Sequence, residues 1–149
     1  MDKLILMIHP TTGLIGLLSA VWVFVEALNA SPRNKARLYW GSVLTAVMMI
    51  ATWIAGGYWY VNYYAVDKAL ILKGVYPLAH TIVMETKEHA FFITLILSFL
   101  LVVVTRFEDV SMNRGARLLV LTASALVVLS AFAIEGAGAL IAMAARLSI

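Results

Sequence analysis

The sequence predicts an all-α integral membrane protein, a single four-helix bundle domain over residues 1–149. With 63% hydrophobic and only 13% charged residues, the chain has more apolar surface than a core of its size can bury. The apolar residues also come in long blocks rather than in amphipathic stripes, as in membrane spans of about twenty residues. Four such blocks can be drawn, so we expect four spans.

The first two spans are predicted at residues 10–29 and 38–60. Pro10 fits the first turn of a helix, where its missing N–H has no partner to lose, and Asn-Ala-Ser-Pro at 29–32 is a stop signal. The far end of the second span carries aromatic residues typical of a membrane interface, namely Trp53, Tyr58, Trp59, Tyr60, Tyr63 and Tyr64.

The other two spans are predicted at residues 77–106 and 115–146. Pro77 is a helix-start signal, and the helical pattern that follows is longer than a bilayer requires, so this helix should protrude from the membrane. The last span contains an apolar run that is interrupted by Glu135.

The distribution of basic residues predicts the orientation. The connections after the first and third spans contain Arg33, Lys35 and Arg37, and Arg106, Arg114 and Arg117, whereas the 61–76 loop contains Lys68 and Lys73. Because basic loops stay in the cytoplasm, both termini and the 61–76 loop should be extracytoplasmic. In a bacterial plasma (inner) membrane, this side faces the periplasm. Near the cytoplasmic end, Glu26 is expected to pair with Arg33 or Arg37.

Composition excludes several classes of function. The formal net charge is only +3 and no broad basic patch is present, so nucleic-acid binding is not expected. The chain has no cysteine, which excludes disulfides, iron–sulfur clusters, thiolate metal sites and covalently attached haem c. A cofactor would have to be held by His, Glu, Met or the backbone.

Polar residues at one depth of the apolar chain indicate a site. His89 lies about 17 residues before Arg106, and Glu135 about 18 residues after Arg117, which places both roughly 25–27 Å from the cytoplasmic ends of their helices. At about 100° per residue, Glu85, Glu88 and His89 share one face of their helix. Ionisable groups in membrane helices are functional candidates by default, so we expect these four residues to converge.

Two further features lie near this depth. Lys87 falls on a different face from Glu85 and is expected to extend toward the headgroups. Glycines also gather at this level: Gly13, Gly16, Gly56, Gly57, Gly136 and Gly138. They predict either close helix contact or a recess for a cofactor or substrate.

Haem b is the first chemistry that these residues could support. His9 and His89 are the expected axial ligands, with His80, predicted to be solvated, as the reserve. In architecture the chain resembles small four-helix membrane cytochromes and quinol-facing anchor subunits. A haem near one face cannot carry electrons across the whole bilayer by itself, so this hypothesis implies electron exchange with quinone, with other redox subunits or with a periplasmic redox partner.

Two alternatives stay open. An iron or copper ion could be bound by Glu85, Glu88, His89 and Glu135, although the paired Glu-x-x-His pattern of di-iron bundles is absent. Alternatively, Glu85, Glu88 and Glu135 could form a proton relay without a cofactor, in a proton-coupled transporter or an assembly subunit. Small residues on the last helix allow a homo-oligomer. No motif identifies a substrate, so the sequence does not decide whether the protein is an enzyme.

Overall fold

The computed structural model describes residues 2–148, apart from the side chains of residues 2, 3 and 5. Within that part the chain is all-helical. Its elements are α1 (Asp2–Leu28), the 3-10 turn η1 (Pro32–Asn34), α2 (Lys35–Asn62), α3 (Tyr64–Lys73), the π-helical segment η2 (Ala79–Met84), α4 (Glu85–Phe107) and α5 (Arg114–Arg146).

Four helices are long and apolar enough to cross a membrane, which confirms the all-α class and the expected number of candidate spans. The candidate spans are Leu6–Leu28, Pro32–Asn62, Ala79–Phe107 and Arg114–Arg146. Large apolar side chains such as Ile96, Leu129 and Phe132 are exposed on their outer surfaces. These surfaces suit contact with lipid, as expected of a multi-pass membrane protein.

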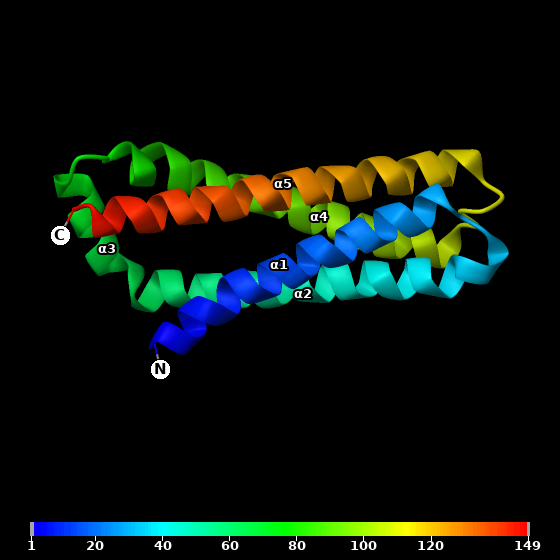
Figure 1. Ribbon diagram of the computed structural model, residues 1–149, viewed down its shortest axis with the longest axis horizontal. Coiled ribbons are helices and arrows are strands. Elements are labelled where there is room, and N and C mark those ends of the chain that lie inside the picture. Colours follow the sequence, from blue (N-terminus) through cyan, green and yellow to red (C-terminus); the bar gives the residue numbers. More distant parts are fainter. Residues whose placement is uncertain (1, 149) are drawn as a thin grey trace.

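The four long helices form a ring. α1 contacts α2 and α5, and α4 contacts the same two helices from the other side. Both termini and α3 lie at one end of the bundle, called here the terminal end, and the two short connections lie at the other, called here the basic end (Figure 1).

α1 begins earlier than the sequence predicted. It starts at Asp2, so Pro10 lies inside the helix rather than in its first turn. The hydroxyls of Thr11 and Thr12 donate to the carbonyls of Met7 and Ile8 across this turn. Threonine side chains of this kind help membrane helices to tolerate an internal proline, which the start-signal rule does not consider.

The predicted 61–76 loop contains a helix. Tyr64 and Ile71 of α3 are buried, and they pack in one apolar cluster with Ile141 and Ala144 near the end of α5. This contact places α3 across the terminal end of the bundle (Figure 1). Its ten residues lack a strong amphipathic pattern, so no separate helix was predicted there.

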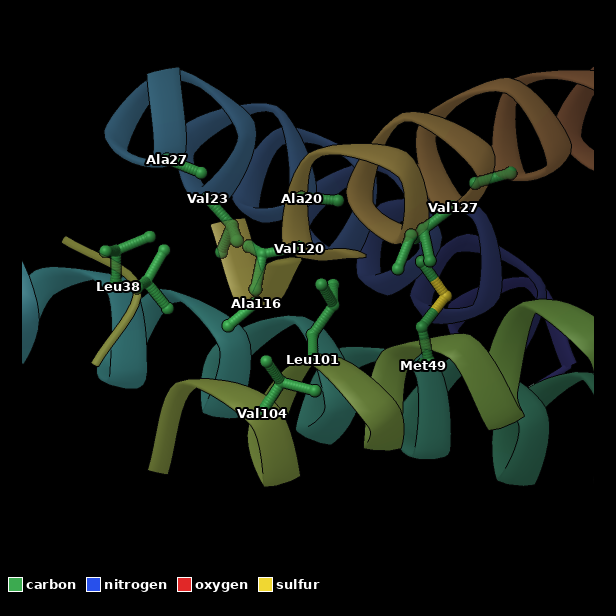
Figure 2. Packing of buried hydrophobic residues seen from close by; sticks show 13 residues of the cluster. Ala20, Val23, Ala27, Leu38, Met49, Leu101, Val104, Ala116, Val120 and Val127 are labelled. Atoms are coloured by element: carbon green, nitrogen blue, oxygen red, sulfur yellow. The ribbon is translucent and has the colours of Figure 1, made fainter. Parts of the chain in front are cut away.

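The main apolar core lies toward the basic end. Val23 of α1, Met49 of α2 and Leu101 of α4 are at most 2% exposed, and α5 adds Val120 and Val127. Figure 2 shows these side chains meeting between the four helices. The core is therefore continuous across all four helices at this end.

Buried hydroxyl groups interrupt this core without leaving unsatisfied donors. They belong to Ser19, Ser42, Thr45, Ser98, Thr105 and Ser124. Each donates to the carbonyl four residues earlier in its own helix. Small hydroxyl residues at such positions let membrane helices approach closely.

At the basic end, side-chain contacts join α1 to α2 and to α5. Arg37 Nε lies 2.8 Å from Glu26 Oε1, which confirms the pairing expected for Glu26. The buried Asn34 amide donates to Glu26 Oε2 at 2.8 Å and to the carbonyl of Asn29 at 3.1 Å. Arg117 of α5 donates to the carbonyls of Ala27 and Leu28, so the end of α1 is tied to both neighbours.

Candidate functional site

His9 of α1 is anchored to α2 by three short contacts. Its Nδ1 lies 2.8 Å from the Thr52 carbonyl oxygen and 2.9 Å from Thr52 Oγ1, and that hydroxyl donates to the His9 carbonyl at 2.7 Å. Because a carbonyl oxygen only accepts, Nδ1 carries the proton. A Cβ atom on Gly56 would lie 2.7 Å from Nδ1, so the imidazole occupies the space beside that glycine.

Two more ionisable side chains lie beside glycines of neighbouring helices. The Glu135 carboxylate of α5 fills the space that a methyl group on Gly13 of α1 would take, with Oε1 nearest. Lys87 of α4 reaches α5, where its Nζ would lie 3.4 Å from a Cβ atom on Gly138. The contacts between α1 and α2, between α5 and α1, and between α4 and α5 each contain one such pair.

These contacts form one polar layer, defined here as His9, Thr52, Lys87 and Glu135. The Lys87 ammonium interacts electrostatically with the Glu135 carboxylate and with the His9 imidazole. Among the described residues, no direct ion pair joins Lys87 to Glu135. The two charged groups therefore interact electrostatically without a direct ion pair. The three ionisable side chains are half-buried, whereas Thr52 is buried.

The face of α4 predicted to point inward points outward. Glu85, His89 and Phe92 are exposed, and His89 Nδ1 donates to the carbonyl of Glu85, 2.6 Å away in the same helix. Phe92 makes an edge-on contact with the exposed Trp53 of α2, with ring centroids 6.2 Å apart. Only Glu88 of the predicted group on this helix is half-buried.

Lys87 lies on the inward face instead. The buried positions of α4 include Thr94, Ser98, Leu101 and Thr105, and Lys87 lies seven residues before Thr94 on the same side. Its side chain therefore lies between α4 and α5, and its expected extension toward the headgroups stays a prediction. Because the outer face of a membrane helix is as apolar as its inner face, the hydroxyl residues at three- and four-residue spacing were the better sequence signal.

His80 is buried rather than solvated, which corrects the prediction for this residue. It is 5% exposed, and its Nδ1 lies 3.2 Å from the hydroxyl of Tyr64. Tyr64 lies outside the four spans, where burial, with smaller effects of Tyr60 and Asp67, raises its pKa to about 12. The pair joins α3 to the π-helical segment η2 at the terminal end.

The predicted four-residue group is not assembled. Within the described residues, no three His, Asp or Glu side chains lie close enough together to hold a metal ion. Glu135 instead faces Gly13 and Lys87, while Glu85 and His89 lie on the outer surface of α4. The three histidines occupy separate surroundings on α1, η2 and α4.

The glycines have two different environments. The expected recess at Gly13 and Gly56 is filled by the side chains of Glu135 and His9. By contrast, no atom lies within 4 Å of a Cβ position on Gly57 or Gly136. Thr52 was not singled out in the sequence, since a lone threonine in an apolar helix gives no signal of a histidine partner.

No family model, curated protein or solved structure matches this chain. The functional argument therefore depends on the polar layer.

Proposed function

We propose that this protein exchanges protons within the membrane, as a small proton-coupled transporter or as a proton-transferring subunit of a larger assembly. Glu135 is the proton acceptor and donor, and Lys87 and His9 control its charge. The observation that carries this proposal is the placement of a carboxylate and an ammonium between helices without a direct ion pair. Intramembrane carboxylates with nearby cations are typical of proton-coupled membrane proteins.

Lys87 has a clear role in this scheme. An ionised carboxylate in a low-dielectric environment needs a compensating positive charge, and Lys87 supplies it. When Glu135 takes up a proton, Lys87 loses the interaction with that carboxylate, and Glu88 remains as the acidic group that interacts with the Lys87 ammonium. Protonation therefore weakens the electrostatic attraction between α4 and α5, which is the kind of change that can drive helix movement.

Proton access is expected from the terminal end. The polar layer lies on the terminal side of the main apolar core, and its ionisable groups are only half-buried. Most core hydroxyl groups donate to carbonyls of their own helices, and one hydroxyl bond, from Thr94 of α4 to Ser130 of α5, crosses between helices. Among the described residues these bonds form no continuous donor chain toward the basic end. Under the orientation predicted from the loops, protons would come from the periplasmic side of a bacterial inner membrane.

Infrared difference spectroscopy in lipid nanodiscs tests this proposal directly. A pH step should produce a carboxylic acid C=O band that disappears in Glu135→Gln and moves in Glu135→Asp. Lys87→Met should shift the pH midpoint of that band, because it removes the nearest cation. Glu85→Gln, which alters an exposed carboxylate on the same level, is the matched control and should leave the band in place. A band that persists in Glu135→Gln would overturn the assignment.

Haem b binding is the second candidate function, and one specific observation favours it. Nδ1 of His9 donates to the Thr52 carbonyl, and Nδ1 of His89 donates to the Glu85 carbonyl. Metal-binding histidines are usually oriented in this way, with the second nitrogen left for the ligand. Such a protein would exchange electrons with quinone or with redox partner subunits.

An absorption spectrum separates the two candidates. Haem binding requires a Soret band and a reduced α-band in protein purified in mild detergent, and both should be lost in His9→Ala and His89→Ala. His80→Ala is the control, since this imidazole is 5% exposed and packs beside Tyr64 of α3. A spectrum without these bands, from protein that retains the Glu135 infrared signal, would eliminate haem and leave proton exchange.

A further inference from the structure

A second polar surface lies at the basic end, far from the polar layer. An open depression of about 450 Å³ lies between the connection after α4 and the first turns of α5. Its polar part is lined by Ser111, Arg114 and Arg117, and its apolar part by Leu118 and Leu121. The depression therefore changes from cationic to apolar along the direction of α5.

The cationic part has uncompensated charge. Arg114 is exposed, and its guanidinium makes no hydrogen bond or ion pair with any other described residue. Arg117 is fixed in place because its guanidinium donates to the carbonyls of Ala27 and Leu28. These neutral acceptors orient Arg117 without cancelling its charge.

The nearby acidic groups are already engaged. Asp109 lies 3.9 Å from Lys35 Nζ and accepts a hydrogen bond from the Ser111 hydroxyl at 2.6 Å. Glu108 accepts from the Asn113 amide at 2.9 Å. Among the described residues, no acidic side chain forms a direct ion pair with either arginine of the depression.

The apolar part lies on the lipid side of the helix. Leu118 is 54% exposed, and it belongs to the span Arg114–Arg146. An occupant must therefore be anionic beside the arginines and apolar one turn further into the membrane. A soluble phosphate compound meets only the first requirement, whereas a phospholipid meets both.

We propose that this depression binds one anionic phospholipid. Its phosphate would lie between Arg114 and Arg117, and the start of an acyl chain would lie along Leu118 and Leu121. Arginine suits this role because its planar guanidinium donates to phosphate oxygens in pairs. The site would fix a lipid at the junction of α1 and α5, where Arg117 already joins the two helices.

Native mass spectrometry of detergent-purified protein tests the proposal. After addition of phosphatidylglycerol or phosphatidylcholine, one phosphatidylglycerol should stay bound in preference to phosphatidylcholine. Arg114→Gln should weaken that binding about fivefold, the effect expected from one basic residue near an anionic lipid. Arg114→Lys should retain most of it.

Two controls keep the test specific. Arg146→Gln removes an exposed arginine in the last turn of the same helix, at the other end of the bundle, and should not change binding. Excess inorganic phosphate should not displace the lipid. Equal retention of both lipids, or unchanged binding in Arg114→Gln, would overturn the proposal, and full displacement by phosphate would show a soluble-anion site instead.

Discussion

At the scale of single residues, the polar layer depends on glycines as much as on ionisable groups. His9 and Glu135 each occupy the space beside a glycine of the next helix, so a small residue on one helix determines where an ionisable group on another can lie. The usual explanation for glycine in membrane helices is close backbone contact. Here the space beside Gly13 and Gly56 holds polar side chains instead.

Adjacent glycines on α2 give a residue-scale prediction. Gly56→Ala should displace the His9 ring, because the added Cβ would lie 2.7 Å from Nδ1 and Cε1, and should lower the thermal stability of the protein in detergent. The expected loss is about 1–3 kcal/mol of unfolding free energy. Gly57→Ala is the matched control, since its methyl group meets no atom within 4 Å and alanine favours the helix. Equal stability losses in the two variants would contradict the proposed position of His9.

At the scale of elements, α3 and η2 close the terminal end through Tyr64 and His80. The tyrosine hydroxyl and the imidazole lie 3.2 Å apart, and Tyr64 belongs to the same buried cluster as Ile71 and Ile141. π-helical turns are often found at functional positions. In this protein, η2 leads directly into α4 a few residues before Lys87, so a change at His80 is well placed to affect the polar layer.

The raised pKa of Tyr64 predicts an alkaline loss of stability. Between pH 10 and about 12 the unfolded tyrosine ionises while the folded one keeps its proton, so the unfolded state binds fewer protons. The stabilising contribution is therefore complete below pH 10 and is lost as the pH rises toward 12. Denaturation curves measured across this pH range should show that the free energy of unfolding falls less steeply with pH in Tyr64→Phe than in the original protein. Tyr58→Phe, at an exposed position, should leave the pH dependence unchanged.

At the scale of the whole molecule, the ring of four helices places both termini and α3 at one end. The basic connections lie at the other end, so a single labelling experiment reports the orientation of the entire bundle (Figure 1). The chain contains no cysteine, which makes introduced thiols unambiguous.

The predicted orientation places the terminal end outside the cell. In intact cells, an impermeant thiol reagent should label Val75→Cys and should not label Met112→Cys, both of which replace exposed residues. Basic loops are retained in the cytoplasm, which is the physical reason for this expectation. The reverse labelling pattern would invert the topology and would move proton access to the cytoplasmic side.

The sequence predicted the fold more successfully than the site. Length and hydropathy identified the four helices because membrane insertion depends on those properties alone. The inward face of α4 could not be identified from the polarity of its residues, since Glu85 and His89 are ionisable yet lie on the outer surface of the bundle. Glu135 could be singled out because it lies inside an apolar run, but its neighbours Gly13 and Lys87 depend on the relative rotation of three helices.

The one-sided position of the polar layer also determines how the protein would respond to membrane voltage. Glu135 lies roughly 27 Å along its helix from Arg117, in a hydrocarbon layer of about 30 Å. A proton that reaches it from the terminal end crosses about one tenth of the electric field. Since a full crossing is worth about 2.3 kcal/mol per 100 mV, this step gains only about 0.2 kcal/mol. Occupancy of Glu135 would therefore follow the proton concentration on that side and would be nearly indifferent to the membrane potential.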